Sequence, residues 1–462
     1  MTVISRKAFR EYDVRGIVGH EITPELAYLI GRAFGAEVRS VQGKSICVGR
    51  DGRLSSPELS KNLIQGLLES GLNIYELEVG PTPMTYFAAH TLELDAAIMV
   101  TGSHNPGNHN GFKMVLKGNS FWGQRVQDLL RRIESKDFIN GQGTHQHYSI
   151  VKAYTDYLVD SFMSYYRDQP PLKVAWDPGN GAAADVVSDI VQRLPGQHYV
   201  LNGTIDGHFP SHHPDPTVSK NLVQLQEIIL KEKCDLGVAF DGDGDRLGVV
   251  DGEGTILWGD EFLVLLAEEV LKNHPGATII ADVKASQSFF EAVHQMGGNP
   301  LMWKTGHSLI KTKMKETKAP LAGEMSGHIF YSDRYFGFDD GIYAALRLIG
   351  ICGSLQSSLA EWNRSRPERV NTPEIRISCE NHDKFEIVSN ITEVLKSKGV
   401  TIDLTDGVRV VNEKGWWLLR ASNTQDVLVV RAESTSRNDL KILVHNVQEC
   451  LKPYGIEVND AA

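Results

Sequence analysis

Cysteine is scarce in this chain, and no apolar run is long enough to cross a membrane. The 462 residues include five widely separated cysteines that form no CxxC pair: Cys47, Cys234, Cys352, Cys379 and Cys450. Such an odd, scattered set suits neither a disulfide framework nor a cysteine-based zinc site, and it is typical of a reducing cytoplasm. The first residues, MTVISRKAFREYDVRG, carry charges where a signal peptide would have an apolar stretch. We therefore expect a cytoplasmic protein without a membrane segment.

The chain also has no excess of positive charge. The formal net charge is −11, which argues against nonspecific binding to nucleic acid or to an anionic membrane surface. Hydrophobic residues make up 41% of the chain and charged residues 23%, the proportions of an ordinary globular protein. The length exceeds what one hydrophobic core usually serves, so about three domains are expected, with two to four reasonable.

Three aspartates at alternate positions are the most informative motif that is present. Asp241, Asp243 and Asp245 are separated by Gly242 and Gly244, and the apolar runs 236–240 and 247–250 flank them. These runs predict two buried strands joined by an acidic turn. The glycines, which lack Cβ, let the backbone leave extended geometry so that the carboxylates converge on one ion.

The chemistry of this turn favours magnesium. Mg²⁺ is a hard cation that proteins bind through a few carboxylates together with phosphate oxygens. Arg246 follows the last aspartate directly and carries the planar fork of donors that suits a phosphate. The motif therefore predicts a metal-assisted site for a phosphorylated ligand.

Two alternatives compete with this interpretation. A calcium loop of the EF-hand type needs glycine at its sixth position and glutamate at its twelfth, where this chain has Arg246 and Gly252. A solvated acidic turn is common on protein surfaces, but three carboxylates crowded between apolar strands repel one another. A bound cation is the simplest source of compensating charge.

An apolar strand followed by a turn and an amphipathic helix recurs along the chain. Copies start near residues 45, 172 and 277, and each suits a βα unit of a mixed α/β domain. Polar stretches at 137–149 and 363–373 resemble linkers. After residue 371 the order changes to helix, three short strands and helix, which predicts a separate small α+β domain.

A second chemical signal is TGSHNPGNHNGFK at 101–113. It follows the apolar run LDAAIMV, so Ser103 is expected in a loop at the end of a strand, where catalytic side chains are often displayed. A serine beside a histidine is usually only part of a capped turn, and the GxSxG elbow of hydrolases is absent. However, His104 and Lys113 can move protons, and a metal would assist attack on phosphorus by the Ser103 hydroxyl.

Four motifs in order give the chain a resemblance to a known family. TGSHNP, DGDGDR, GEMSGH at 323–328 and RASNT at 420–424 are similar to the motifs of bacterial phosphomannomutase/phosphoglucomutases of the α-D-phosphohexomutase family. The resemblance covers essentially the whole chain. It implies an α/β protein with three related mixed α/β domains and a small C-terminal α+β domain around a central cleft. The implied domains are 1–150 with the phosphoserine loop, 151–253 with the metal-binding loop, 254–367 with the sugar-recognition loop and 368–462 with the phosphate-binding loop.

The resemblance also implies a reaction. A phosphorylated Ser103 gives its phosphoryl group to a hexose phosphate, and the resulting hexose 1,6-bisphosphate turns over and returns its other phosphate to the serine. Mannose 1-phosphate, glucose 1-phosphate or both would be converted into the 6-phosphates in this way, as a step of carbohydrate metabolism that supplies nucleotide-sugar and polysaccharide precursors. The implied cofactors are Mg²⁺ and the bisphosphate, the implied partner is the phosphosugar, and a monomer is expected.

Site residues follow from the same resemblance. The implied catalytic residues are Ser103, His104, Lys113, Arg15, Arg246 and His328, and the implied metal ligands are phosphorylated Ser103, Asp241, Asp243 and Asp245. The implied substrate contacts are Tyr12, Lys284, Gly306, His307, Glu324, Met325, Ser326, Gly327, His328, Arg420, Ala421, Ser422, Asn423 and Thr424.

The residue chemistry agrees with these roles. RASNT offers a guanidinium, two hydroxyls and an amide to a distant phosphate on the loop between two apolar strands. Glu324 and Ser326 can accept and donate hydrogen bonds to sugar hydroxyls, and His328 can bind substrate or assist proton transfer. His307 is expected to open a helix whose N-terminus suits an anion. Arg50 and Arg53 serve equally well as structural ion-pair partners.

The chain departs from the family pattern at two places. The family usually has an aromatic residue at the position of His109, and threonine and proline commonly follow RASNT where Gln425 and Asp426 stand. The first departure bears on loop packing, and the second places a carboxylate beside a phosphate loop.

Alternative activities remain open at this stage. Phosphoglucosamine mutase shares the machinery, although its sugar loop typically has glutamine where this chain has Met325. A magnesium-dependent sugar phosphatase would release free phosphate, and a catalytically silent phosphosugar binder would lack turnover.

Overall fold

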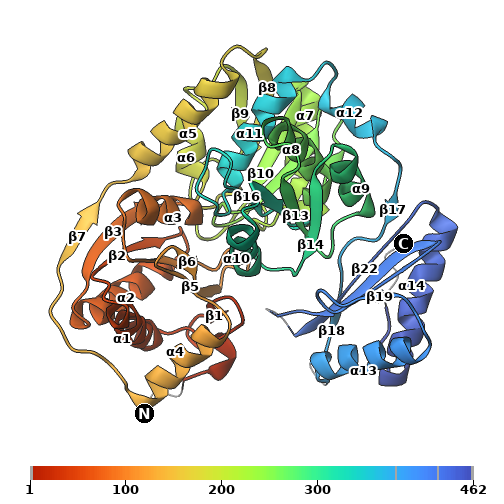
Figure 1. Ribbon diagram of the computed structural model, residues 1–462. Helices are drawn as coiled ribbons and strands as arrows, with labels where there is room; N and C mark the ends of the chain where they lie inside the picture. The colour runs from red at the N-terminus through yellow and green to blue at the C-terminus, as the bar shows by residue number, and fades with distance from the viewer. Residues whose placement is uncertain (1–3, 380–381, 424–425, 459–462) are drawn as a thin grey trace.

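The computed structural model describes residues 4–379, 382–423 and 426–458. Within these residues the strands form four sheets that follow one another along the chain, each with its own helices (Figure 1).

The first sheet has the order β1-β5-β4-β2-β3-β7, with β6 paired to β5. Its strands are β1 (Val14–Ile17), β2 (Ser45–Arg50), β3 (Asn73–Val79), β4 (Ala96–Val100), β5 (His109–Leu116), β6 (Asn119–Ser120) and β7 (His145–Tyr148). A short 3₁₀ helix, Arg6–Ala8, precedes α1 (Pro24–Ser40), α2 (Ser56–Glu69), α3 (Thr82–Thr91) and α4 (Gln124–Ser135). Ile46 and Val48 of β2 pack with α1, α2 and α4, whereas Cys47 between them faces α3, because successive side chains of a strand point to opposite faces.

The second sheet has the order β12-β11-β10-β8-β9. Its strands are β8 (Leu172–Asp177), β9 (Gly196–Val200), β10 (Leu236–Phe240), β11 (Leu247–Asp251) and β12 (Ile256–Leu257). Its helices are α5 (Val151–Tyr166), α6 (Ala184–Ile190), the 3₁₀ turn Ser219–Leu222 and α7 (Val223–Glu232). β10 and β11 form an antiparallel hairpin, and every residue of both strands is buried.

The third sheet has the order β14-β13-β15-β16. Its strands are β13 (Thr278–Asp282), β14 (Asn299–Trp303), β15 (Leu321–Gly323) and β16 (Ile329–Tyr331). Its helices are α8 (Gly259–Asn273), α9 (Gln287–Gln295), α10 (His307–Thr317), α11 (Gly341–Ser354) and α12 (Leu359–Ser365).

The fourth sheet has the order β17-β22-β21-β20-β19, with β18 also paired to β22. Its strands are β17 (Val370–Asn371), β18 (Ile375–Ser378), β19 (Ile402–Asp403), β20 (Val408–Asn412), β21 (Gly415–Ala421) and β22 (Val427–Ser434). Helices α13 (Lys384–Ser397) and α14 (Arg437–Leu451), with a final 3₁₀ turn at Lys452–Tyr454, enclose a separate hydrophobic core.

The second and third sheets share one hydrophobic core, and α11 lies in its middle. Asp340 caps this helix by accepting hydrogen bonds from the backbone N–H groups of Ile342 and Tyr343. The hydroxyls of Tyr154 on α5 and Tyr335 donate to the other carboxylate oxygen at 2.7 and 2.5 Å. This buried cap ties α5 to the third sheet.

In the described part of the chain no single helix is long and apolar enough to cross a membrane, although α11 and α12, bent by 86° at their junction, pass together on length and composition.

The predicted fold class is confirmed, with three mixed α/β units followed by a small α+β unit. The three predicted βα repeats correspond to β2–α2, β8–α6 and β13–α9. The expected linker 137–149 is more ordered than its polar composition indicated, because residues 145–148 form β7 and pair with β3. β12 lies just beyond residue 253 and pairs with β11, so the second sheet extends to residue 257.

Five strands end at the predicted functional loops. The loops that carry Ser103, Arg246, Lys284, Thr305 and Glu324 follow β4, β10, β13, β14 and β15 respectively, and each reaches one central cavity. Open α/β sheets commonly bind ligands beyond the carboxyl ends of their strands.

Candidate active site

One cavity of about 350 Å³ collects residues from all four sheets. The predicted site residues that line it are Tyr12, Arg15, Ser103, His104, Lys113, Arg246, Lys284, Gly306, His307, Glu324, Met325, Ser326, His328, Arg420 and Ser422. The arrangement therefore brings together motifs that are more than 300 residues apart in the sequence. Its volume lies within the usual range of small-molecule sites.

The acidic turn between β10 and β11 lies behind the wall of the cavity: its three aspartates do not line the cavity, but Ser103, Lys113 and Arg246, which contact them, do. Asp241, Asp243 and Asp245 are fully buried, and one carboxylate oxygen from each lies within 4.8 Å of the others. A Cβ on Gly242 would lie 2.4 Å from the carbonyl oxygen of Ser103, so glycine is required for the two loops to touch. Gly244 adopts φ +73°, which lets the turn close.

Elements of the first sheet hold the acidic turn in place. Thr82, the first residue of α3, donates its backbone N–H to the Asp243 carbonyl at 2.8 Å and its hydroxyl to the Asp243 carboxylate at 2.5 Å. Lys113 of β5 places its ammonium 2.6 Å from Asp243 and 2.5 Å from Asp245. Burial opposes a charge on Lys113, but these two carboxylates raise the pKa of its ammonium well above the usual range.

Negative charge in the cluster exceeds what Lys113 compensates. Burial, together with Asp243 and Asp245, raises the pKa of Asp241 well above its usual range. Burial also opposes ionisation of Asp245, but Lys113 and His328 outweigh it and hold the pKa of this carboxyl well below its usual range. Such opposed shifts at adjacent carboxyls mark a strongly coupled group.

The residues present fit a divalent cation. Among the described residues, the buried Oδ1 of Asp243 has no hydrogen-bond partner, so an oxygen ligand remains available. Three clustered carboxylate oxygens are the donor set that Mg²⁺ prefers. A cation would also reverse the raised pKa of Asp241, because it favours the ionised carboxylate.

Ser103 lies directly against this cluster. Its hydroxyl donates to Asp241 Oδ2 at 2.9 Å and lies 3.2 Å from Nδ1 of His104. Ser103 has φ +50°, a left-handed conformation that is uncommon for a residue with a Cβ and that frequently marks a functional site. Burial and the charges of Arg246 and Arg15 lower the pKa of His104 well below its usual range, so the imidazole is neutral.

Arg53 determines the shape of the Ser103 loop. Its guanidinium donates to the backbone carbonyls of Ser103 and Asn105 at 2.6 Å each, and an ion pair of 3.2 Å joins it to Asp51. Further bonds reach the carbonyls of Pro106 and His109. Arg53 therefore has the structural role, not a substrate-binding one. Its guanidinium can make all these contacts at once because it carries five N–H donors.

His328 connects the loop 323–328 to the acidic turn. Its Nε2 lies 3.2 Å from Asp245 and its Nδ1 lies 2.9 Å from Glu324. Burial alone would lower the pKa of His328, but these two carboxylates raise it to about 9. A protonated ring donates from both nitrogens, so the Arg246 Nε atom, 3.3 Å from His328 Nε2, is a neighbouring cation and not a hydrogen-bond donor to it.

The same loop is tied to helix α10. Glu324 accepts the backbone N–H of Gly306 at 2.7 Å, and His307 begins α10, as predicted. Met325 donates its backbone N–H to Asp282 at 3.1 Å, and the Ser326 hydroxyl lies 3.4 Å from His328 Nδ1. Burial and the ammonium of Lys311 lower the pKa of His307 well below its usual range, so a neutral imidazole faces the cavity.

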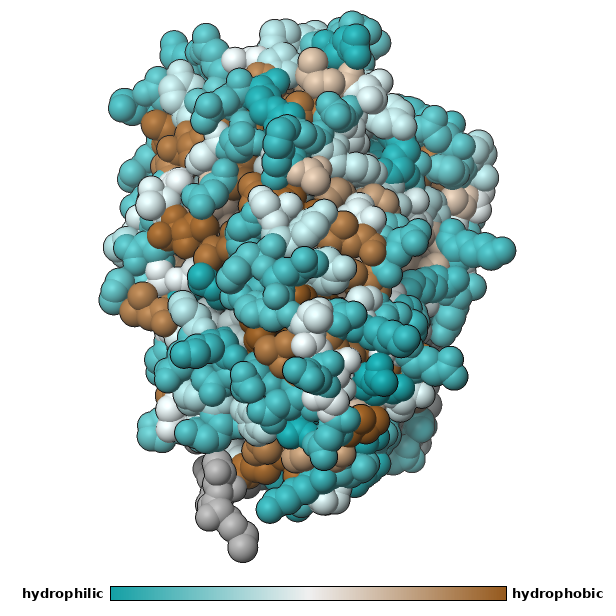
Figure 2. Space-filling view, turned by 90° about the vertical axis from the view of Figure 1, so that its left-hand side faces the viewer, coloured by the Kyte–Doolittle hydropathy of each residue, from teal (hydrophilic) through white to brown (hydrophobic). Residues whose placement is uncertain are grey.

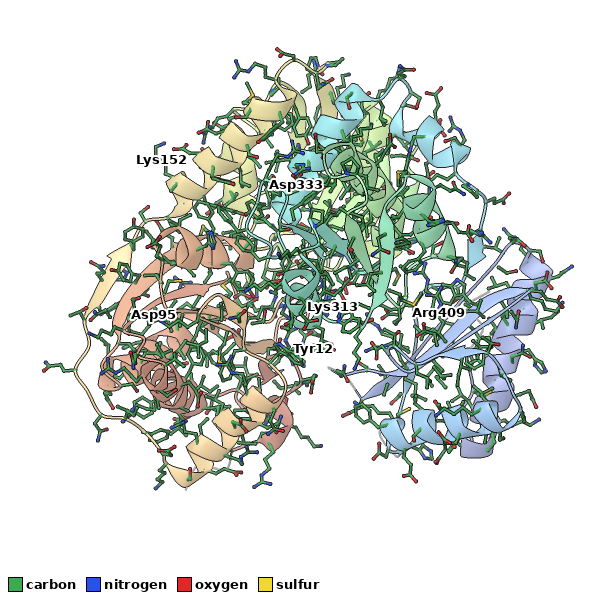
Figure 3. The ribbon with its side chains drawn as sticks, viewed as in Figure 1. Tyr12, Asp95, Lys152, Lys313, Asp333 and Arg409 are labelled. Atoms are coloured by element: carbon green, nitrogen blue, oxygen red, sulfur yellow. The ribbon has the colours of Figure 1, made fainter. Side chains whose placement is uncertain are left out.

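Tyr12 joins the first unit of the chain to the third and fourth. Its hydroxyl donates to the Thr305 carbonyl at 2.8 Å and accepts from the Asn423 amide at 2.7 Å, near the centre of the molecule (Figure 3). Gly306 packs on its ring, because a Cβ there would lie 2.5 Å from Tyr12 Cζ. These contacts close the cavity on one side.

At the end of the cavity away from Ser103, two cationic side chains each pair with a carboxylate. Lys284 lies 2.8 Å from Glu374, and Arg420 donates to Asp406 at 3.0 Å. Arg420 is almost fully buried at the end of β21, next to Ala421 and Ser422. Burial opposes charge, but Asp406 raises the pKa of Arg420, and Glu374 does the same for Lys284.

Some predicted residues lie at the margin of the site or outside the described residues. Thr424 and Gln425 fall outside the described residues. Asp426 forms an ion pair of 3.1 Å with Lys384, and its side chain is 75% exposed, so its charge is partly screened. His109 begins β5, and Gly327 has φ +92° against the backbone of Leu247.

Several functional positions escaped sequence reasoning. Thr82, Asp406 and Glu374 each orient a predicted site residue, and Asp51 orients Arg53, yet none was expected at the site from the sequence. Their partners are between 2 and 161 residues away in the sequence, and two of the four contacts, those of Thr82 and Glu374, cross from one sheet to another. Arg376, which lines the cavity and pairs with Glu374, was missed for the same reason.

Comparisons with known proteins cover the whole site. Family models described as phosphoglucomutase/phosphomannomutase alpha/beta/alpha domains I, II and III match residues 6–140, 152–254 and 258–370, and the C-terminal domain model of the same series matches 374–449. A Pseudomonas aeruginosa phosphomannomutase/phosphoglucomutase is 45% identical over 94% of this chain and 93% of its own. A Neisseria gonorrhoeae phosphoglucomutase is 39% identical over 98% and 97%. A solved phosphoglucomutase/phosphomannomutase family protein from Burkholderia thailandensis is 40% identical, with a TM-score of 0.91 and complete coverage of both chains.

The contact between the two loops gives a first prediction. Gly242→Ala should lower the free energy of unfolding by roughly 1–3 kcal/mol and reduce phosphosugar turnover, because the new methyl group pushes the acidic turn away from Ser103. Gly107→Ala in the serine loop is the control, since a Cβ there meets nothing closer than 3.7 Å. Denaturant unfolding and steady-state kinetics measure both effects. Equal stability and turnover for the two variants would contradict the claim that the contact between the acidic turn and the Ser103 loop requires glycine at position 242.

Proposed function

Because the chain belongs to the phosphoglucomutase/phosphomannomutase family and is thus a hexose-phosphate mutase, an isomerase, we propose that it works through a phosphoserine at Ser103, a hexose 1,6-bisphosphate and Mg²⁺. The substrates are the 1- and 6-phosphates of mannose, glucose or both. One observation carries the proposal: the Ser103 hydroxyl lies 2.9 Å from Asp241 in a cavity whose other end holds Arg420 and Lys284. A reacting anion site and a distant one are both needed to move a phosphate between two ends of a sugar.

The proposed phosphoryl transfer involves no oxidation or reduction. The free hydroxyl of the hexose phosphate forms a bond to phosphorus as the bond from phosphorus to Ser103 Oγ breaks, which yields the bisphosphate and free serine. The bisphosphate turns over, and Ser103 Oγ then attacks its other phosphate and regenerates phosphoserine. Mg²⁺ held by Asp241, Asp243, Asp245 and the phosphoserine would supply positive charge to the transferring group.

Protonation states assign the roles around Ser103. His104 is neutral and 3.2 Å from the serine hydroxyl, so it suits a proton acceptor. Lys113 is held charged by two carboxylates and therefore stabilises negative charge, together with Arg15 and Arg246. His328 is protonated, and because its two N–H groups face Asp245 and Glu324, it adds positive charge beside the reacting site and positions Glu324 for the sugar.

The distal phosphate is assigned to the fourth unit. Arg420, Ser422 and Asn423 offer charged and neutral donors from the end of β21, and Thr424 is proposed as a further contact. Glu324, Met325 and Ser326 face the sugar between the two phosphate sites, with Gly327, Ala421, Gly306, His307, Lys284 and Tyr12 as the other substrate contacts.

The remaining expectations are proposals on the same basis. We propose a cytoplasmic monomer that serves precursor synthesis for nucleotide sugars and polysaccharides, with four domains at 1–150, 151–253, 254–367 and 368–462. Phosphoglucosamine mutase activity is disfavoured by Met325, and a magnesium-dependent sugar phosphatase is disfavoured because hydrolysis would not need the second, distant anion site at Arg420 and Lys284.

Loss of the nucleophile is the most direct variant test. Ser103→Ala should reduce conversion of glucose 1-phosphate by several orders of magnitude, because Ser103 is the motif serine whose hydroxyl lies against the three aspartates. Intact-mass and peptide analysis of the freshly purified protein should locate one phosphoryl group on Ser103. Full turnover by Ser103→Ala, or a phosphoryl group on another residue, would show that the mechanism is wrong. Ser135→Ala, at the exposed end of α4, is the control.

The metal ligands are tested separately. Asp243→Asn keeps the side-chain shape but removes one negative charge, so the Mg²⁺ concentration for half-maximal turnover should rise roughly tenfold or more. Turnover should fall far more than stability, although the variant also weakens the 2.6 Å ion pair between Asp243 and Lys113. Magnesium titrations of turnover and denaturant unfolding measure the two effects, with Asp185→Asn on the exposed face of α6 as control. An unchanged magnesium requirement would count against the acidic cluster as the metal site.

The distal site must serve both orientations of the bisphosphate. Arg420→Ala should therefore weaken the 1-phosphate and the 6-phosphate alike and raise the share of substrate that is hydrolysed. Kinetics with both substrates and free-phosphate release measure this, with Arg437→Ala on exposed α14 as control. An effect confined to one substrate would rule out a shared phosphate site.

A further inference from the structure

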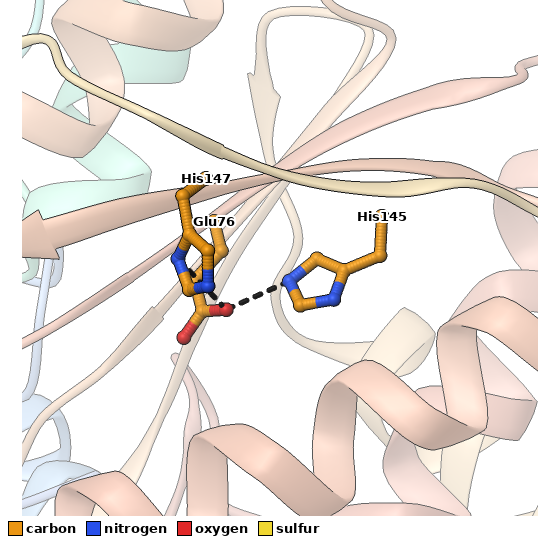
Figure 4. A group of neighbouring side chains, drawn as sticks. All are labelled: Glu76, His145 and His147. Atoms are coloured by element: carbon orange, nitrogen blue, oxygen red, sulfur yellow. Dashed lines mark hydrogen bonds and ion pairs between the residues drawn. The ribbon is translucent and has the colours of Figure 1, made fainter.

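A second group of metal-binding side chains lies far from the cavity, where β7 pairs with β3. Glu76 of β3 is the direct partner of His147 on β7, and His145 lies two residues earlier on the same strand. Since residues i and i+2 of a strand point to the same side, both imidazoles face the Glu76 carboxylate (Figure 4).

The three side chains converge on one point. Nε2 of His145 is 2.7 Å and Nδ1 of His147 is 3.4 Å from the same oxygen, Oε2 of Glu76. One ligand atom from each residue lies within 4.8 Å of the other two. Zinc bonds of 2.0–2.1 Å at tetrahedral angles require ligand atoms about 3.3 Å apart, so small side-chain rotations bring all three into place.

We propose that Glu76, His145 and His147 bind a divalent transition-metal cation of the zinc type. Two imidazoles and one carboxylate are a common zinc donor set, and a water molecule completes four-coordination. The same donors suit Ni²⁺ and Cu²⁺. The His147 side chain is 82% exposed, so an ion can reach the site from solvent.

The backbone around this group is held in advance of binding. Parallel pairing of residues 145–148 with 74–77 fixes the register, and on the opposite face Tyr75 and Tyr148 form an edge-to-face pair with ring centroids 5.8 Å apart. Glu78 accepts the backbone N–H of Ile150 at 3.1 Å and fixes the chain after β7. A site on paired strands needs little ordering of the chain when the ion binds.

Ligand type separates this site from the acidic turn. Asp241, Asp243 and Asp245 offer only oxygen, which favours a hard cation, whereas the β3–β7 group offers two nitrogens and favours softer transition metals. A third group, Asp245, His328 and Asp339, shares Asp245 with the acidic turn, and both nitrogens of its one imidazole already face the carboxylates of Asp245 and Glu324. An excess of Mg²⁺ should therefore occupy the first group and leave the second available.

Metal binding would hold in place the segment that connects the first unit to the second. β7 is the edge strand of the first sheet, on the side of the molecule that faces the viewer in Figure 2, and α5 begins three residues after it. In that view apolar residues are scattered over a mainly hydrophilic surface. An ion bound across β3 and β7 stabilises their pairing, because it binds only the paired arrangement.

The full-length protein in excess Mg²⁺ provides the test. Calorimetric titration with Zn²⁺ should show one equivalent bound, and His145→Ala, His147→Ala and Glu76→Gln should each weaken this binding by at least about tenfold. Hydrogen exchange at residues 145–148 should slow when Zn²⁺ is added to the natural sequence and not when it is added to His147→Ala. The exchange readout distinguishes a bound ion from a mere loss of stability in the variants.

Matched variants identify the binding position. His294→Ala removes an exposed histidine that belongs to none of the His/carboxylate groups in the described residues, and it should bind Zn²⁺ as the natural sequence does. Retention of the Zn²⁺ equivalent in His145→Ala and His147→Ala, or its loss in Asp243→Asn alone, would overturn the proposal. Absence of any Zn²⁺ binding by the natural sequence would overturn it equally.

Discussion

Repulsion among three buried carboxylates is the constraint on which the site depends. Asp241, Asp243 and Asp245 converge within 4.8 Å in a protein interior where like charges interact strongly. The buried strands β10 and β11 fix the turn, and Lys113 compensates part of its charge from another sheet. The clustered carboxylate oxygens fit a divalent cation, and the Ser103 hydroxyl lies 2.9 Å from one of them, Oδ2 of Asp241.

The units of the protein contact one another around this acidic turn. The acidic turn contacts α3 through Thr82 and the loop 323–328 through His328, so elements of three sheets meet at this turn. The fourth unit reaches this assembly through Asn423 and Tyr12 and through the ion pairs of Arg420 and Lys284. The second and third sheets share one hydrophobic core that also includes residues of α3, whereas the fourth unit encloses a core of its own, so the boundary of the fourth unit is where the cavity can open while each core stays intact.

The sequence predicted the α/β class, the strand–turn–strand around the aspartates and the strand-end position of Ser103, because these depend on local pattern and turn chemistry. It did not predict Asp406, Glu374 or the strand β7. Acidic partners of buried cations are recognisable only once the fold brings distant residues together, and β7 gains its order from pairing with β3 although its own residues are polar.

A single-turnover experiment tests the central claim most directly. The protein is labelled with radioactive phosphate on Ser103 and then mixed with unlabelled glucose 1-phosphate in a quenched-flow instrument. The account predicts that the label first enters the bisphosphate and then glucose 6-phosphate, while the phosphate of the substrate remains on Ser103. Label that leaves as inorganic phosphate, or stays on the protein while glucose 6-phosphate forms, would contradict transfer through this serine.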